Sequence, residues 1–407
     1  MILPSFNELD SVQKSIFTED NKNKNILIIG PPGTGKTIVA FHKALNLKNL
    51  GKKVILIMYN KVLLKYTKST SAASNINLST MHSWIYKMWR QSEKLEGSRP
   101  PVKDNNRFAI DWFKVLTDIK AINNKEDLEI INWGHMIIDE GQDFPDDMFF
   151  CLHFLTNHFK KHGLESTLTI FADENQVITE NNARISSIEQ HLGIVEGDNR
   201  KFCLTKNFRN TRQIANFAKH FMNADYYGTP VDPPNKSGPR PSILIYPKRQ
   251  NNSQSLFKIK DPIFYPKIKK LIYQLPNKKY AIIIDGNNSD LENVYYSFAK
   301  LFEGSKFKVQ GYINEHPKFE LSVENLDFIS DNTITILNKK SSKGTEFDIV
   351  FFIGIEQTKY DHTEGVDVMK NLFVISSRAK EQFYIVFGMI DEKEGMPAIT
   401  KILPNPE

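Results

Sequence analysis

The chain has 407 residues, a formal net charge of +6, 40% hydrophobic residues and 25% charged residues. This composition is typical of a globular protein, and it excludes an intrinsically disordered chain and a histone-like coat of positive charge. The length exceeds that of one ordinary hydrophobic core, so we expect two domains, with room for a small insert.

Cysteine content and hydropathy exclude further classes of protein. Two cysteines, Cys151 and Cys203, are too few for a disulfide framework or a four-thiolate zinc site. The longest apolar stretch, residues 349–355, is too short to cross a bilayer, and residues 1–4 lack the pattern of a signal peptide. We therefore expect a cytoplasmic protein with no membrane partner.

Short apolar runs alternate with longer amphipathic stretches along the chain, which predicts an α/β fold with parallel sheets. Between residues 85 and 133 the strand pattern is lost, and aromatic and charged residues predict a small helical insert. Residues 230–241 are rich in Pro, Gly and Ser and predict a connector. The expected strands are residues 26–29, 54–58, 136–138, 168–171, 280–284, 333–337, 349–355 and 383–387.

A glycine-rich segment follows the first expected strand and precedes a predicted helix over residues 37–50. Its spacing is G-x-x-x-x-G-K-[ST], in which backbone N–H groups face phosphates. Lys36 would reach the β- and γ-phosphates of ATP, and the Thr37 hydroxyl would ligate Mg²⁺. Alone, such a loop does not separate kinases, GTPases, transporters and motors. The segment consists of Gly30, Pro31, Pro32, Gly33, Thr34, Gly35, Lys36 and Thr37.

Two adjacent acids, Asp139 and Glu140, end the expected strand at residues 136–138. Asp139 can hold Mg²⁺ through water, and Glu140 can orient or deprotonate an attacking water. Two solvated acids at a strand end are the ordinary explanation of such a pair. Beside an intact phosphate-binding loop, the catalytic explanation is favoured.

The acidic pair continues into Gly141, Gln142 and Asp143, and this segment resembles the second motif of superfamily 1 helicases of the UvrD, Rep and PcrA type. The other motifs of that family follow in the same order over nearly the whole chain. The matching segments are Leu9–Gln13, Asn60–Lys61, Thr80–Ser83, Asp139–Asp143, Ala172–Gln176, Asn207–Thr211, Ser342–Asp348 and Val374–Lys380.

The resemblance implies two RecA-like lobes of the P-loop NTPase type, with ATP and Mg²⁺ between them. The first lobe would cover residues 1–202, with the insert at about residues 85–133, and the second lobe residues 203–407. By the same resemblance Gln13 would read adenine and Glu346 would hydrogen-bond the ribose.

Phe208 stands where the family has an aromatic residue that stacks on adenine, although core packing would explain a Phe equally well. Gln176 would sense the γ-phosphate. An ATPase also needs positive charge near that phosphate, and Arg209 and Arg378 are candidates from the second half of the chain. Without the motif series, both arginines would be read as surface salt-bridge partners.

Asn60, Thr80 and His82 stand where the family contacts single-stranded DNA, and their side chains can hydrogen-bond phosphate or sugar, so RNA is also compatible. Tyr59 or Trp84 could stack bases. A lone His or Trp is more often structural, and only the motif series raises these residues above that expectation.

Two departures from the family reduce the expected machinery. The base-stacking Tyr and Trp that follow the third motif are missing after Gln176, and Ile38 stands where the family has an adenine-clamping Arg. Residues 210–341 are too few for a large accessory subdomain between the fourth and fifth motifs. The resemblance is therefore to a compact, near-minimal form of the motor.

Three functions remain open from the sequence. The leading one is a nucleic-acid-dependent ATPase that translocates on or unwinds DNA. The second is an ATPase switch subunit that senses nucleic acid and regulates a partner such as a nuclease, for example in phage defence. A catalytically inactive nucleic-acid binder is disfavoured, because no phosphate-loop, acidic or arginine position is lost.

Overall fold

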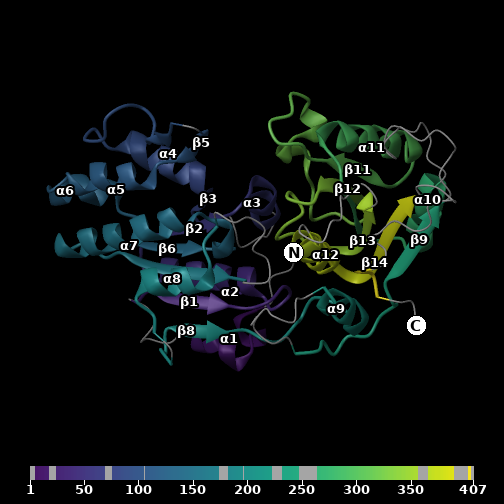
Figure 1. Ribbon diagram of the computed structural model, residues 1–407, viewed down its shortest axis with the longest axis horizontal. Helices are drawn as coiled ribbons and strands as arrows, with labels where there is room; N and C mark the ends of the chain where they lie inside the picture. The colour runs from purple at the N-terminus through teal and green to yellow at the C-terminus, as the bar shows by residue number, and fades with distance from the viewer. Residues whose placement is uncertain are drawn as a thin grey trace.

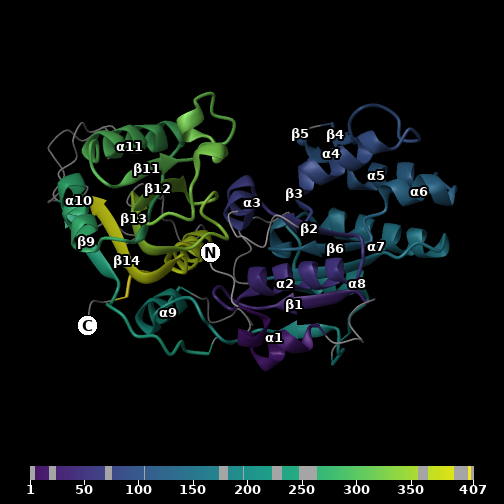
Figure 2. The same ribbon diagram turned by 180° about the vertical axis from the view of Figure 1, so that it is seen from behind.

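The computed structural model describes residues 5–17, 24–68, 76–104, 106–173, 182–195, 197–221, 232–246, 264–355, 365–388 and 402–404. These residues form two lobes that lie side by side, each built on a parallel six-stranded sheet (Figures 1 and 2). In the described part of the chain, no helix combines the length and hydropathy needed to cross a bilayer.

The first sheet has the strand order β3-β2-β6-β7-β1-β8, and every pairing in it is parallel. Its four central strands are buried almost completely, because helices cover both faces of the sheet. The strands are β1 (Ile26–Ile29), β2 (Val54–Met58), β3 (Leu78–Thr80), β6 (His135–Ile138), β7 (Thr167–Ala172) and β8 (Lys201–Cys203).

The second sheet has the strand order β11-β12-β10-β13-β14-β9 and is also parallel throughout. All eight expected strands are present, and the predicted α/β class with two RecA-like lobes is confirmed. The strands are β9 (Ser242–Tyr246), β10 (Lys279–Ile284), β11 (Lys308–Gly311), β12 (Thr333–Asn338), β13 (Phe347–Ile353) and β14 (Ala379–Gly388).

Helices pack on both faces of each sheet. Apolar side chains of α2 and α3 meet one face of the first sheet, and those of α4, α5, α7 and α8 meet the other. In the second lobe, α9 and α12 share one face and α10 and α11 the other. The helices are α1 (Ser11–Ser15), α2 (Lys36–Asn49), α3 (Lys61–Lys68), α4 (Met81–Gln91), α5 (Trp112–Lys120), α6 (Lys125–Ile131), α7 (Asp146–Lys161), α8 (Ile185–Leu192), α9 (Arg212–Lys219), α10 (Phe264–Gln274), α11 (Asn288–Leu301) and α12 (Gly365–Ser376).

The insert contains more than the predicted helices. Between α4 and α5 the chain forms a small antiparallel hairpin of β4 (Val102–Lys103) and β5 (Asn106–Ile110), which the sequence pattern does not predict. The expected connector lies partly outside the described residues, at 230 and 231. From 232 to 241 it has no helix or strand beyond an isolated bridge at Asp232.

One hydrophobic cluster runs continuously from the first lobe into the second. The α3 side chains Leu63 and Tyr66 belong to the same buried cluster as Phe328 and Phe347 of the second lobe. The rings of Tyr66 and Phe328 meet edge to face, with their centroids 5.2 Å apart. Helix α3 therefore fastens the two lobes together beside the cleft between them.

Candidate functional site

A cleft of about 360 Å³ lies between the lobes at the carboxyl ends of the first sheet's strands. Parallel strands direct the loops that follow them to this edge, which is where ligands bind in open α/β sheets. Both lobes line the cleft, and the lining includes the phosphate-binding loop, Glu140, Phe208 and Arg378. The structure thus brings together segments that are far apart in the sequence.

The phosphate-binding loop turns tightly between β1 and α2. Gly33 and Gly35 both have φ +83°, and a Cβ on Gly33 would lie 2.5 Å from Asn207 Oδ1, so the loop requires glycine there. The Lys36 ammonium donates to the carbonyls of Gly30 (2.6 Å) and Pro31 (3.2 Å). The loop therefore curls around the lysine and forms a cradle of the kind that holds phosphates.

Thr37 and Asp139 meet beside this cradle. The Thr37 hydroxyl donates to Asp139 Oδ2 at 2.7 Å, and Asp139 is fully buried. Burial and the neighbouring Glu140 raise the pKa of Asp139 to about 7. Hydroxyl and carboxylate oxygens are ligands that Mg²⁺ prefers, and a cation would relieve the cost of two adjacent buried carboxylates, so the pair fits the metal.

Glu140 lies next to Lys36 in the lining of the cleft and has a left-handed backbone, with φ 57°. Such a conformation is costly for a residue other than glycine and is concentrated at functional sites. Gln142 donates to Glu140 Oε2 at 2.7 Å and accepts from the backbone N–H of Asp173 at 2.9 Å. Burial opposes ionisation, but Lys36, Lys343 and this hydrogen bond keep the pKa of Glu140 below its ordinary value.

Two arginines of the second lobe reach the same cleft. Arg378 is 1% exposed, and its guanidinium donates to the Val374 carbonyl (2.8 Å) and the Ser377 hydroxyl (3.0 Å). Burial and the nearby Arg209 lower the pKa of Arg378 to about 10, so it remains protonated at neutral pH. Arg209 is held through its Nε by Glu346, at 2.8 Å from Oε2.

Gln13 and Phe208 both contact the backbone of the phosphate-binding loop and line the cleft. The Gln13 amide donates to the Thr34 carbonyl (3.1 Å) and accepts from the Asp10 backbone N–H (3.0 Å). The Phe208 backbone N–H donates to the Gly33 carbonyl at 2.9 Å, while its ring is 51% exposed at the cleft. The exposed ring is free of the core packing that offered the competing explanation for this residue.

Two contacts between the lobes were not expected from the sequence. The Tyr66 hydroxyl hydrogen-bonds the Glu346 carboxylate, so α3 is tied to the residue that holds Arg209. Lys343 of the second lobe forms an ion pair with Asp143, and each side chain is 3% exposed. No local pattern in the sequence identifies these partners, because about two hundred residues or more separate them.

The residues expected to contact a nucleic acid strand lie at the starts of helices α3 and α4. Asn60 caps α3 by accepting from Leu63 N (2.7 Å), and Thr80 caps α4 by accepting from Ser83 N (3.3 Å). His82 is exposed, and its Nε2 lies 3.0 Å from the Phe108 carbonyl oxygen. The structure therefore places all three at the same edge of the first sheet as the phosphate-binding loop.

Three other residues expected to contact nucleic acid or nucleotide have different outcomes. Trp84 is 6% exposed and packs edge to face against Trp133, so the expectation that it could stack a base is wrong. Tyr59 is partly buried against Phe144. Gln176 lies outside the described residues, which stop at Asp173 and resume at Asn182.

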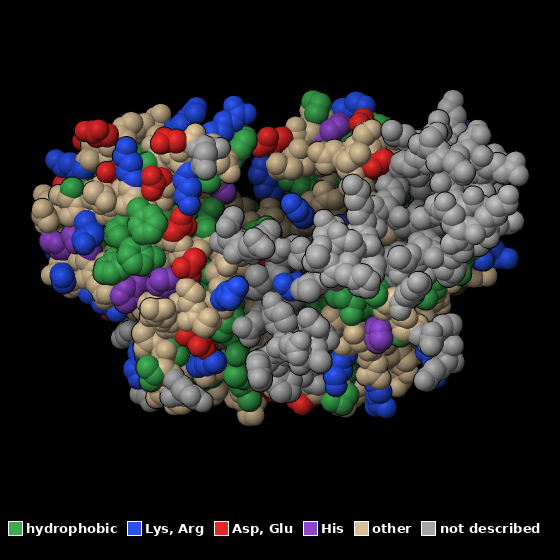
Figure 3. All heavy atoms as spheres, viewed as in Figure 1, with side chains coloured by type: hydrophobic (Ala, Val, Ile, Leu, Met, Phe, Trp, Pro, Cys, Tyr) green, Lys and Arg blue, Asp and Glu red, His purple; other side chains and the backbone are tan. Residues whose placement is uncertain are grey.

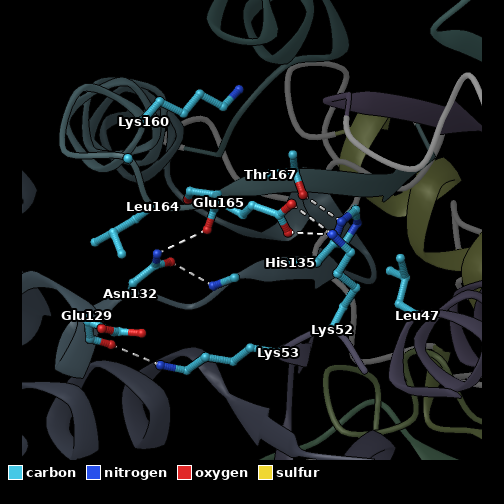
Figure 4. Close-up of a pocket in the computed structure, with 13 residues that line it drawn as sticks. Leu47, Lys52, Lys53, Glu129, Asn132, His135, Lys160, Leu164, Glu165 and Thr167 are labelled. Atoms are coloured by element: carbon cyan, nitrogen blue, oxygen red, sulfur yellow. Dashed lines mark hydrogen bonds and ion pairs between the residues drawn. The ribbon is translucent and has the colours of Figure 1, made fainter. Parts of the chain in front are cut away.

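A second cavity, of about 500 Å³, lies at the amino ends of the same strands (Figure 4). Its polar groups largely satisfy one another: Lys52 pairs with Glu165 at 2.6 Å, and Lys53 donates to the Glu129 carbonyl at 3.2 Å. His135 is bonded on both ring nitrogens by threonine hydroxyls. Size alone therefore does not identify the functional cavity; the convergent chemistry lies in the cleft between the lobes.

Comparisons with known proteins agree with this architecture. The sequence matches the AAA domain family over residues 13–182. The crystal structure of the DUF1998 helicase MrfA bound to DNA and AMPPNP has a TM-score of 0.50 and 12% identity, over 93% of this chain and 48% of that one. The chain has a helicase-like P-loop fold. It spans about half the length of that MrfA structure.

Two further helicase structures are similar at lower scores. The Pif1 helicase from Candida albicans has a TM-score of 0.45 and 12% identity, covering 93% of this chain and 94% of that one. The Escherichia coli DEAH/RHA helicase HrpB has a TM-score of 0.47 and 10% identity, covering 94% and 42%. A search of the curated protein sequences gave no match.

Proposed function

We propose that this protein is a nucleic-acid-dependent ATPase of the superfamily 1 helicase type, a compact relative of UvrD, Rep and PcrA, which couples ATP hydrolysis to translocation on or unwinding of DNA. The observation that carries the proposal is the cleft between the lobes. There the phosphate cradle and Glu140 of the first lobe line the same cleft as Arg209 and Arg378 of the second lobe. A ligand that touches both sides can draw the lobes together.

The proposed division of the chain is a first lobe over residues 1–202, with the insert at about 85–133, and a second lobe over residues 203–407. In this assignment Gln13 and Phe208 hold the base, Glu346 the ribose, and residues 30–37 the phosphates. Thr37 and Asp139 hold Mg²⁺, which when bound neutralises phosphate charge. Gln176 keeps its proposed role as the sensor of the γ-phosphate, from outside the described residues.

Each catalytic role follows from the surroundings of the residue. Glu140 is kept ionised by nearby positive charge, so it can accept the proton of an attacking water. Lys36, Arg209 and Arg378 supply the positive charge that a γ-phosphate needs as it leaves, which in related enzymes is worth about 10³- to 10⁵-fold in rate for one arginine. To stabilise the γ-phosphate, Arg209 must break its ion pair with Glu346 and bind the phosphate instead.

The test is ATP turnover by the Glu140→Gln variant, measured with and without single-stranded DNA, duplex DNA and RNA at one stated salt concentration. We expect turnover to fall by about 10²- to 10⁴-fold while ATP binding persists, because only the proton acceptor is lost. Glu303→Gln, which changes an exposed acid of the second lobe, is the matched control. Turnover near normal in Glu140→Gln would refute the assignment, and turnover that no nucleic acid stimulates would refute the dependence.

An aromatic surface on the first lobe favours a second candidate function. Phe113 (56% exposed), Phe150 and Phe154 (38% exposed) form a continuous patch on α5 and α7, with ring centroids 5.4 and 4.7 Å apart. Figure 3 shows apolar side chains gathered over these helices. Such patches often mark protein contacts, so the alternative is an ATPase switch that senses nucleic acid and regulates a partner such as a nuclease. Hydrolysis on tailed duplexes without strand separation would favour it.

A further inference from the structure

The β4-β5 hairpin presents an aromatic ring beside the proposed strand contacts. Phe108 of β5 is 63% exposed, although Ile110, on the same face of the strand, is 3% exposed in the first-lobe core. The core ends beneath Ile110, so the Phe108 ring projects beyond it. A single exposed Phe is ordinary on a protein surface, and three further observations distinguish this one.

The first observation is that the side chain of Arg107 lies over the Phe108 ring. The Arg107 guanidinium carbon lies 5.0 Å from the Phe108 ring centroid. Flat aromatic rings and guanidinium planes are the surfaces on which unpaired nucleobases stack, and the positive charge suits the adjacent phosphates. The combination is matched to a nucleic acid strand better than to an apolar protein segment.

The second observation is that the hairpin is held in place. His82 Nε2 lies 3.0 Å from the Phe108 carbonyl oxygen, and Asn106 Oδ1 accepts from the Phe108 N–H at 3.0 Å. Lys103 pairs with Asp147 of α7 at 2.8 Å. These contacts hold the backbone that carries the ring, so less freedom is lost when a ligand binds and more of the contact energy is retained.

The third observation is location. In both views β5 lies on the side of the first lobe that faces the second lobe (Figures 1 and 2). Figure 3 shows the surface indented between the lobes, with Lys or Arg side chains on the floor of the indentation. Because His82 Nε2 lies 3.0 Å from the Phe108 carbonyl oxygen, a nucleic acid strand bound at His82 would lie next to the hairpin.

We propose that Phe108 and Arg107 form a stacking site for one unpaired base of the bound strand. The site would replace part of the base stacking that the family obtains from the residues missing after Gln176. This inference rests on the proposed function, because it requires that single-stranded nucleic acid lies along His82.

The experiment compares binding of two labelled strands of equal length, an oligothymidine and a fully abasic strand with the same phosphates. For wild type, the ratio of the abasic to the oligothymidine dissociation constant measures the contribution of the bases. Phe108→Ala should lower this ratio by about 5- to 150-fold, since stacking of one base is worth about 1–3 kcal/mol. Phe108→Trp should retain the ratio, because it keeps a flat ring.

Phe113→Ala is the control, since Phe113 lies in the same insert and is also exposed (56%) but packs against Phe150. It should leave the ratio unchanged. An unchanged ratio in Phe108→Ala, with wild type binding oligothymidine normally, would overturn the stacking site and leave the proposed function intact. Wild type that binds neither strand would overturn the proposed function itself.

Discussion

Asp143→Asn is expected to weaken the contact between the two lobes. The change keeps the shape of the side chain and removes its charge, which leaves the Lys343 ammonium at a site where both partners are 3% exposed. Removal of one member of a buried ion pair costs about 3–5 kcal/mol. Lys343 also interacts electrostatically with Glu140, so one negative charge remains near the ammonium in the variant. We therefore expect a loss of unfolding free energy at the lower end of this range, about 3 kcal/mol.

The double variant Asp143→Asn with Lys343→Met separates the pair from its surroundings. Burial raises the pKa of Asp143 to about 7; Lys343 opposes this rise and Glu140 adds to it. The charged form of Asp143 therefore itself lowers the stability of the folded protein. Removing both charges should therefore recover most of the stability that the single change loses. The two substitutions should be strongly non-additive, because the residues are in direct contact.

Urea unfolding followed by two signals measures this prediction, at about pH 8, where an Asp143 carboxyl with a pKa of about 7 is mostly ionised. All four tryptophans lie between residues 84 and 133, so their fluorescence reports the first lobe, while circular dichroism reports both lobes. In Asp143→Asn both transitions should move to lower urea and separate from each other. A single variant within about 0.5 kcal/mol of wild type, or a double variant that loses the sum of both single changes, would refute the reasoning.

Two further predictions concern Tyr66 and His135. Tyr66→Phe keeps the ring contact with Phe328 but removes the hydrogen bond to Glu346. The KM for ATP should therefore rise about tenfold, while kcat stays within about twofold of wild type. An unchanged KM would refute the role of Tyr66 in positioning Glu346. Burial and nearby lysines lower the pKa of His135 to about 3, below the ordinary 6.5. Neutral His135 therefore contributes fully to the stability of the fold above pH 6.5, and this contribution is lost as the pH falls towards 3. From pH 7 to pH 5 wild type should lose about 2 kcal/mol more than His135→Gln in urea unfolding, and equal losses would contradict it.

The expected strands show which strands of a parallel sheet can be predicted from sequence. The eight strands that were predicted are the four central strands of each six-stranded sheet. The strands of these two sheets that were missed, β3, β8, β9 and β11, are the edges. Central strands are covered on both faces and so need continuous apolar runs. Edge strands are covered less and are partly exposed here, so their sequences carry a weaker signal.

The candidate site divides in the same way. Close spacing identified the phosphate-binding loop and the pair Asp139 and Glu140, because a tight turn and a strand end constrain neighbouring residues. The order of motifs suggested Arg209 and Arg378, but only the folded chain brings them to one cleft. A local sequence pattern cannot predict that these distant residues come together.

The sequence by itself determined the α/β class, the nucleotide-binding loop and the likeness to helicases, since these follow from apolar runs, from local spacing and from the order of motifs along the chain. The tertiary structure decided that Glu346 holds Arg209, that Asp143 and Lys343 join the lobes, and that Phe108 lies beside His82. These contacts join residues that are distant along the chain. They exist only because packing of the two sheets and their helices fixes where each loop ends.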